Sequence, residues 1–208
     1  MKLDSISISH NAPIPEEFAF GVPAADDHMA LGANRSPHLA WSEAPEGSKS
    51  YAVICVDDDV PSKMDDLNQE GKTIPADLPR IEFYHWVLVD VPASVSQLAA
   101  GADSDGITQG GKPPGPTDHG TRGINDYTMF MGSNPDMAGD YGGYDGPCPP
   151  WNDTIVHHYH FTVYALDLES LGLSGSFTGV QAMEVMEGHV LDKATITGTY
   201  SLNPEVKA

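Results

Sequence analysis

Four segments rich in β-branched and aromatic residues constrain the fold of this chain more than any other feature. They are residues 50–56 (SYAVICV), 81–91 (IEFYHWVLVDV), 159–166 (YHFTVYAL) and 194–202 (ATITGTYSL). The first is a continuous apolar run, which is expected of a strand buried on both faces. The fourth alternates apolar residues or Gly with Thr and Ser, as an edge or half-buried strand does. We expect a further short strand near residues 3–8.

The composition also favours a loop-rich β protein over a helical bundle. The 208 residues include 21 Gly and 17 Pro but only 8% aromatic residues, and the 40% hydrophobic content suffices for one sizeable core. We therefore expect a single domain over residues 1–208. Two segments without periodicity interrupt the strands, at about 61–80 and 101–155. The second is far longer than an ordinary loop, so it carries either function or packing of its own.

One helix is predicted near the C-terminal end. Thr178 and Gln181 have the spacing of a capping box, and Val180, Met183 and Met186 follow at helical spacing. A Met stripe of this kind is more often core than a binding surface, so we expect it to face the core.

The charge excludes some partners. There are 30 acidic and 10 basic residues, a net charge of −20, which argues against nucleic acid and anionic membranes as partners. No apolar run is long enough to span a membrane, and the N-terminal residues lack the apolar region of a signal peptide. Cys55 and Cys148 are expected to be free thiols. We therefore expect a soluble, cytoplasmic protein, in which an anionic ligand would need a local pocket.

Three consecutive carboxylates, Asp57, Asp58 and Asp59, follow the first strand. Strand alternation predicts that Asp57 and Asp59 point to the side of Val53 and Cys55, and that Asp58 points away. A polar turn is the simplest interpretation, since Asp and Pro are common where strands end. A divalent-cation site would need more oxygen ligands than the sequence places here.

His85 lies on the second strand, where alternation places it with Phe83, Val87 and Val89. A single His on an apolar face is more often a core residue than a functional one. Beside Asp57, however, it would be oriented by the carboxylate and made more basic.

Residues 144–161 (YDGPCPPWNDTIVHHYHF) combine a Pro-rich turn with three histidines. Alternation places His157 with Tyr159 on the more apolar face, and His158 with His160 on the other, so the three histidines cannot bind one metal ion. A zinc site from Cys148, His158 and His160 lacks a fourth ligand. Cys148 as a nucleophile lacks an orienting group and an oxyanion hole.

An anion pocket is the remaining interpretation of this segment. The Gly146-Pro147 turn holds its backbone rigidly, and Gly146 permits a ligand to approach an N–H group closely. The histidines can donate hydrogen bonds to phosphate oxygens, most strongly when protonated. Asp57 would accept from a histidine or from a ligand ammonium or hydroxyl group. Tyr144 and Tyr159 would supply a phenol and a ring wall.

Short motifs in a fixed order extend over nearly the whole chain. They are SPHLAW (36–41), APEG (44–47), VDDDVPS (56–62), YHWVLVDVP (84–92), YDGPCPP (144–150), HHY (157–159), FTVYALD (161–167) and GHVLDKATITGTY (188–200). In order and spacing they resemble the phosphatidylethanolamine-binding protein (PEBP) family, in its bacterial and archaeal YbhB/YbcL-type branch, often called Raf kinase inhibitor-like.

The resemblance implies a mainly β fold with a large central sheet, flanked by a smaller sheet and one or two short helices. It also implies a small pocket for phosphate-like anions and phosphoryl head groups, with no cofactor and no metal. A homodimer is expected on this ground alone. With the wall residue Tyr144, the implied ligand-binding residues are Asp57, His85, Gly146, Pro147, His157 and Tyr159, and Asp59 would brace the pocket loop.

Several positions depart from the family pattern. Asp58 stands in place of the usual proline, and His158 stands where Arg is common, which removes a positive charge. The segments 64–80 and 117–140 are longer than in compact members, so we expect them to cover or reshape the pocket mouth.

Three functions fit these residues. The first is a non-enzymatic binding or regulatory protein with a site for a small anionic, phosphoryl ligand. The second is a hydrolase or lyase that uses Asp57, His85 and His157 as acid, base and orienting group. The third is an inhibitor of a protease or kinase, with a protein target, that acts through the long loops. We favour the first, because the sequence contains no identifiable activated nucleophile, metal-ligand set or Gly-rich phosphate loop.

Overall fold

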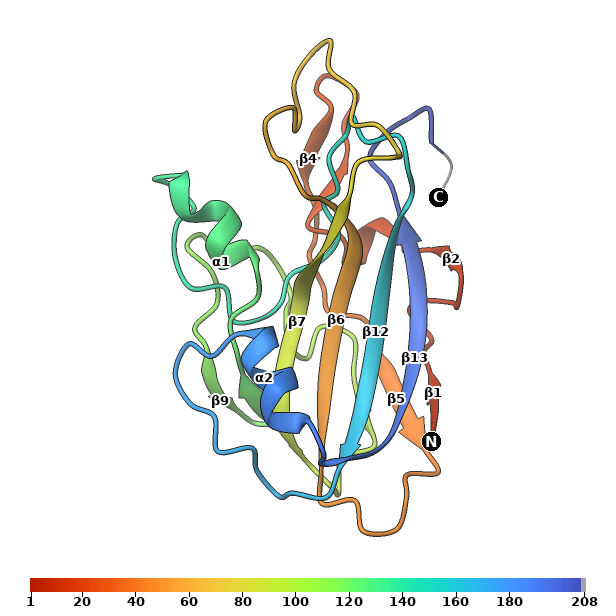
Figure 1. Ribbon diagram of the computed structural model, residues 1–208, viewed down its shortest axis with the longest axis vertical. Helices are drawn as coiled ribbons and strands as arrows, with labels where there is room; N and C mark the ends of the chain where they lie inside the picture. Colours follow the sequence, from red (N-terminus) through yellow and green to blue (C-terminus); the bar gives the residue numbers. More distant parts are fainter. Residues whose placement is uncertain (207–208) are drawn as a thin grey trace.

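The computed structural model describes residues 1–206 and is organised around one large sheet (Figure 1). Every neighbouring pair in it is antiparallel except β13 with β2, which is parallel. In spatial order the strands are β2 (Ala12–Pro13), β13 (Val190–Tyr200), β12 (His157–Leu166), β6 (Ser50–Pro61), β7 (Arg80–Pro92), β10 (Gly120–Arg122) and β9 (Gly115–Thr117), and β11 (Gly143–Tyr144) also pairs with β7.

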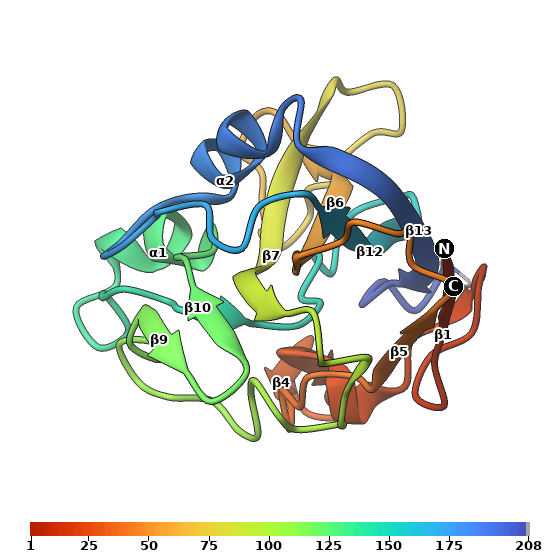
Figure 2. The same ribbon diagram turned by 90° about the horizontal axis from the view of Figure 1, so that it is seen from below.

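The two faces of this sheet are covered differently, as Figure 2 shows. On one face lies α2 (Gly179–Met186). On the other lie a sheet of β1 (Lys2–Asp4), β5 (Leu39–Ser42) and β8 (Gln97–Leu98), and a hairpin of β3 (Gly21–Pro23) and β4 (Met29–Leu31). The remaining helical turns are η1 (Glu16–Phe18), α1 (Tyr127–Phe130) and η2 (Met131–Ser133). This arrangement confirms the mainly β class with a central sheet, a smaller sheet and short helices.

Apolar side chains fill both interfaces. Between the two sheets, Leu39 and Trp41 of β5 pack in one cluster with Trp86, Leu88 and Phe161 of the central sheet. Between the central sheet and α2, a second cluster contains Ile54, Val87, Ala182 and Met186. The central strands are therefore covered on both faces, which explains why residues 50–56 form a continuous apolar run.

The four strong strand predictions are confirmed as β6, β7, β12 and β13, and the short N-terminal strand is β1. β6 extends beyond its predicted end to Pro61, and β12 begins before its predicted start, at His157. Both strands therefore include residues of the polar motifs. The long segment 101–155 is not uniformly irregular, because β9, β10, α1 and β11 lie within it. Both extensions matter for the site described below.

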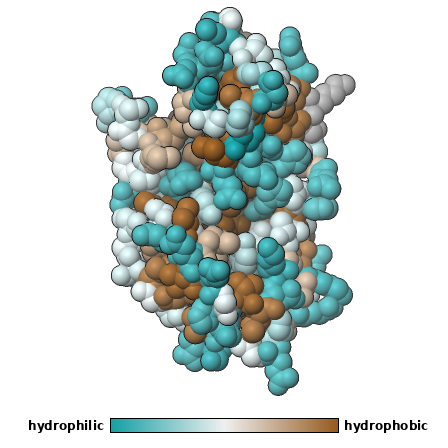
Figure 3. All heavy atoms as spheres, viewed as in Figure 1, coloured by the Kyte–Doolittle hydropathy of each residue, from teal (hydrophilic) through white to brown (hydrophobic). Residues whose placement is uncertain are grey.

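The predicted helix is α2, and its capping box is confirmed. The Thr178 hydroxyl accepts from the backbone N–H of Gln181, whose side-chain oxygen accepts from the Thr178 N–H. The predicted core stripe is only partly correct: Met186 is buried with Ala182, whereas Val180 is 53% exposed. Figure 3 shows hydrophobic atoms over the lower part of this face, where α2 lies. Among residues 1–206, no helix is long and apolar enough to cross a membrane.

Candidate functional site

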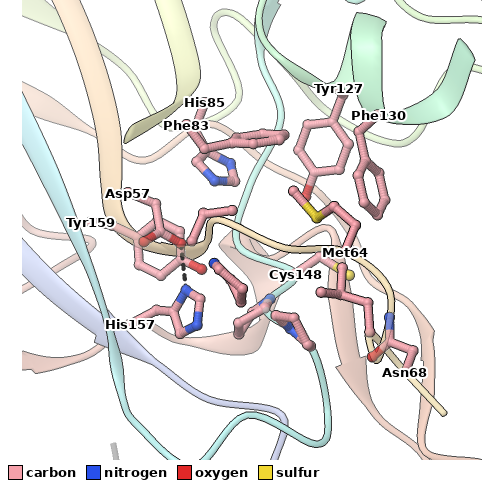
Figure 4. Close-up of a pocket in the computed structure, with 15 residues that line it drawn as sticks. Asp57, Met64, Asn68, Phe83, His85, Tyr127, Phe130, Cys148, His157 and Tyr159 are labelled. Carbon is pink, nitrogen blue, oxygen red and sulfur yellow. Dashed lines mark hydrogen bonds and ion pairs between the residues drawn. The ribbon is translucent and has the colours of Figure 1, made fainter. Parts of the chain in front are cut away.

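The ends of three neighbouring strands bring four of the predicted site residues together. Asp57 of β6 lies opposite Tyr159 of β12 and opposite Phe83 of β7. His157 and His85 come from β12 and β7, and these four polar residues line one pocket. In Figure 4, Asp57, His157 and Tyr159 lie at one side of the pocket. All four side chains are buried.

A β-bulge decides the position of His85. Cys55 of β6 pairs with Trp86, but the next residue, Val56, pairs with Tyr84, so His85 is the extra residue of β7. The predicted face for His85 is therefore wrong. Val87 and Val89 pack on the α2 side of the sheet, whereas His85 lines the pocket on the opposite side with Phe83.

His157 is held between two carboxylates. Its Nδ1 lies 2.8 Å from Asp57 Oδ2, and its Nε2 lies 3.1 Å from Asp153 Oδ2. Asp153 in turn forms a bidentate ion pair with Arg80 at the start of β7. Asp57, His157, Asp153 and Arg80 thus form a chain of side chains with alternating charge. It runs from the pocket wall to the end of the segment that joins β6 to β7.

The pKa values of this chain follow from its pairing. Burial alone would lower the pKa of His157, but the Asp57 and Asp153 carboxylates outweigh it and raise the pKa to about 9. Burial would likewise raise the pKa values of Asp57 and Asp153, yet their bonds to His157, and to Arg80 for Asp153, leave both lowered. The Asp57–His157 pair is therefore an ion pair at neutral pH.

His85 is fixed in the opposite protonation state. Its Nδ1–H donates to the Asp145 carbonyl oxygen at 2.8 Å, because a carbonyl can only accept. Burial lowers the pKa of His85, although Asp57 and Asp145 oppose this. The ring is thus neutral at pH 7 with an unprotonated Nε2. The prediction that the neighbouring carboxylate would make His85 more basic is wrong, since the cost of burying the charged ring is larger.

Tyr159 supplies a free hydroxyl group. Its side chain is fully buried and lines the pocket, and its hydroxyl makes no hydrogen bond of ordinary geometry within residues 1–206, although the Asp57 carboxylate lies close to it. Burial, followed by the nearby Asp57 carboxylate, raises the pKa of Tyr159 well above its ordinary value. A buried hydroxyl without a partner costs free energy, so this group is available to a ligand.

The Pro-rich turn reaches the pocket with the residues that follow the predicted ones. Gly146 and Pro147 do not line the pocket, whereas Cys148, Pro149 and Pro150 do. The Gly146 N–H already donates to the Asn34 side chain. Gly146 is instead needed for close packing, because a Cβ at this position would lie 2.0 Å from the Phe18 carbonyl oxygen.

Tyr144 and Asp59 also lie outside the pocket lining. The Tyr144 hydroxyl donates to the Phe18 carbonyl oxygen in the core between the sheets. Asp59 bonds to the ring and the backbone N–H of His158, on the face opposite His157. The predicted alternation of Asp57 and Asp59 fails because β6 shifts register between Asp57 and Val60. The backbone N–H of Asp59 still braces the pocket, since it donates to Asp57 Oδ1 at 2.9 Å.

The other candidate metal ligands, Cys148, His158 and His160, do not lie together, and Cys148 is not activated as a nucleophile. His160 pairs with Asp58 on the outer face, as alternation predicts for His158 and His160. Burial raises the pKa of the Cys148 thiol to about 12, which makes it a poor nucleophile at neutral pH. Within residues 1–206, no group of three or more His, Cys, Asp or Glu side chains is placed to hold a metal ion.

Sequence reasoning missed the apolar half of the pocket. It comes from the two long segments, and in Figure 4 Met64, Tyr127 and Phe130 lie across from Asp57 and His157. We expected these segments to shape the pocket, but the sequence did not identify which of their residues would line it, because neither segment has a periodic pattern. The space inside the pocket is about 40 Å³, enough for a few water-sized groups.

Comparison with known proteins identifies the family. Residues 4–201 match the family model described as phosphatidylethanolamine-binding protein. The chain belongs to this family. It is 30% identical over 207 residues to the UPF0098 protein YbhB of Escherichia coli, covering 97% of this chain and 100% of that protein. A UPF0098 protein of Methanothermobacter thermautotrophicus is 32% identical over 81% of this chain and 84% of its own length.

Two solved structures share the fold of this family member. The crystal structure of Escherichia coli YbcL, described as a new member of the mammalian PEBP family, superimposes with a TM-score of 0.68 at 25% identity, covering 96% of this chain and 97% of that one. A PEBP homologue from Chlamydia trachomatis has a TM-score of 0.63 at 27% identity and covers 96% of each chain. The resemblance inferred from the motifs is confirmed.

Proposed function

We propose that this protein is a non-enzymatic binding or regulatory protein whose pocket takes a small phosphoryl head group. The observation that carries the proposal is a set of four buried polar side chains, Asp57, His85, His157 and Tyr159, in a pocket whose other lining residues are mostly apolar. Ligand sites commonly combine an apolar wall with a few polar groups placed in this way. The description of the matching family supports a phosphoryl ligand.

The chemistry of the set favours binding over turnover. The only thiol in the pocket has a raised pKa, and His157 is already bonded at both ring nitrogens. Of the two pocket histidines, only His85 has a ring nitrogen, Nε2, that is free to take a proton from a substrate. The two free thiols, Cys55 and Cys148, also support a reducing, cytoplasmic location.

A titration followed by NMR tests the proposal. Inorganic phosphate and phosphoethanolamine are added to the wild type and to His85→Ala and His157→Ala, with His158→Ala on the outer face as the matched control. We expect saturable shifts near His85 in the wild type and the control, and their loss in the two pocket variants. A wild type in which no pocket signal responds to either compound contradicts the proposal. Turnover of a phosphoester that disappears in both pocket variants supports the hydrolase instead.

A further inference from the structure

Both ring nitrogens of the fully buried His157 face carboxylate oxygens. Nδ1 faces Asp57 and Nε2 faces Asp153, at 2.8 and 3.1 Å. An ionised carboxylate can only accept hydrogen bonds, and a neutral imidazole has only one N–H group. If both carboxylates are ionised, both bonds exist only when the ring is a doubly protonated imidazolium.

The other partners of the two carboxylates favour their ionised forms. Arg80 binds both oxygens of Asp153, a geometry that stabilises the anion. The Ile155 N–H also donates to Asp153, at 3.3 Å. On the other side, the Asp59 N–H donates to the second oxygen of Asp57. In each of these bonds the carboxylate is the acceptor.

Within residues 1–206, the charged groups that act most on His157 are the carboxylates of Asp57 and Asp153. The pocket side contributes His85 from β7, which is neutral at pH 7, and the un-ionised Tyr159. Tyr200, the register partner of His157 on β13, donates its hydroxyl to the Gly21 carbonyl oxygen. The charges nearest to the ring are those of Asp57 and Asp153, and Arg80 lies behind the second carboxylate.

We propose that Asp153, held by Arg80, is a positioning residue that keeps His157 as an imidazolium bonded at both nitrogens, so that other pocket groups bind the ligand. Asp57, His157, Asp153 and Arg80 together carry no net charge, and His157 has no N–H group left to donate. This differs from the role that the sequence suggests for His157, which was to donate to a phosphate oxygen.

The ligand would then be bound by two other atoms, the Tyr159 hydroxyl oxygen and His85 Nε2. This inference rests on the proposed function. The Tyr159 hydroxyl is unpartnered and can donate to a phosphoryl oxygen. His85 Nε2 is an acceptor when its Nδ1–H bonds to Asp145, so it can take a proton carried by the ligand, such as a P–OH or ammonium proton. Phosphate and phosphoethanolamine both carry such protons near neutral pH, and the two probes separate the phosphoryl group from the amine.

The free protein tests the positioning role without any ligand. In ¹⁵N NMR spectra at pH 7.5, both His157 nitrogens of the wild type should be protonated. In Asp153→Asn, the titration midpoint of His157 should fall from about 9 toward the ordinary value of 6.5, because one of its two neighbouring carboxylates is gone while Asp57 remains. Asp59→Asn is the matched control, since that carboxylate bonds to His158 on the opposite face, and it should leave His157 unchanged.

Each outcome supports or contradicts one claim. A wild-type His157 with one protonated nitrogen at pH 7.5 overturns the positioning role, even if Asp153→Asn does not fold. On addition of phosphoethanolamine, the His85 ring signals should shift while both His157 nitrogens stay protonated and bonded. A ligand that breaks a His157 bond and leaves His85 unmoved also overturns it. If no ligand signal is seen, the proposed function fails, and the ligand-free spectra still decide the role of Asp153.

Discussion

Single atoms in this pocket differ in whether their hydrogen-bonding capacity is already used. The nitrogens of His157 are both occupied, and the Gly146 N–H is occupied by Asn34. The Tyr159 hydroxyl, equally buried, has no partner among the described residues. Folding stability would be served better by an apolar group at that position, and in the proposed function a ligand supplies the missing partner.

We therefore predict that Tyr159→Phe separates stability from binding. The free energy of unfolding in urea should stay the same or rise by up to about 1 kcal/mol, because an unsatisfied buried hydroxyl is removed. The affinity for phosphoethanolamine should fall by about 2- to 10-fold, as expected for one lost hydrogen bond. Urea unfolding and calorimetric titration measure the two quantities.

Tyr144→Phe is the matched control for this prediction. Tyr144 is equally buried, but its hydroxyl donates to the Phe18 carbonyl oxygen and lies outside the pocket. Its loss should destabilise the fold by about 1–3 kcal/mol, because the carbonyl is left without its donor, and should not change affinity. Equal effects of the two substitutions on stability would show that the Tyr159 hydroxyl has a partner in solution.

Among whole elements, regular strands could be predicted from the sequence and their irregularities could not. Apolar runs gave β6, β7, β12 and β13, and alternation correctly separated His157 from His158. Alternation failed at two of the register shifts, at His85 and after Asp57, because one extra residue reverses every side chain that follows. Both shifts lie beside the pocket, where a strand must re-aim a polar side chain.

The pocket roof is an element that only tertiary contacts define. Residues 62–79 have no periodic pattern, yet they are attached to the segment that precedes β12. The Asn152 side chain donates to the Asp66 and Lys72 carbonyl oxygens and accepts from the Asn68 N–H. Asn68 reciprocates by accepting from the Trp151 N–H. No sequence pattern marks such a pair of amides more than 80 residues apart.

We predict that Asn152→Ala loosens this roof. The three bonds of its side chain are lost, so backbone amides in residues 66–74 should exchange hydrogen faster while those of β6 and β12 stay protected. Hydrogen-exchange mass spectrometry measures both. Asn203→Ala is the control, because Asn203 also donates to this segment, at the Asp153 carbonyl oxygen, without touching residues 62–79. Unchanged exchange in 66–74 for Asn152→Ala would mean that the bonds between Ile74 and residues 152–154, together with apolar contacts, hold the roof.

For the molecule as a whole, a strongly acidic chain pairs three of its ten Lys and Arg residues with buried carboxylates. The net charge is −20, yet Arg80, Lys112 and Arg122 are each paired with a fully buried carboxylate. Asp145 and Asp103, the partners of Lys112 and Arg122, flank the turn that carries the His85 acceptor. The composition gives the net negative charge of the protein, but it could not show that these buried carboxylates are each paired with a Lys or Arg side chain.

Stability should consequently fall as the pH rises from 6.5 to 8, although the protein is acidic throughout this range. The pKa of His157 is about 9 in the folded state and near 6.5 when unfolded, so the folded state holds one more proton between these values. Its contribution is complete below pH 6.5 and is lost as the pH rises toward 9. The slope approaches about 1.4 kcal/mol per pH unit, which gives a loss of about 1–2 kcal/mol by pH 8.

Urea unfolding at pH 6.5, 7.25 and 8 measures this loss, and 0.5 M NaCl separates it from surface repulsion. Salt screens exposed charges strongly and a buried pair weakly, so the slope should persist at high salt. It should persist in Asp59→Asn and become shallower in Asp153→Asn, in which only Asp57 remains to hold the extra proton on His157. A wild-type slope that disappears in salt would assign the effect to the net charge of −20, and the buried Asp57–His157–Asp153 chain would then contribute nothing to it.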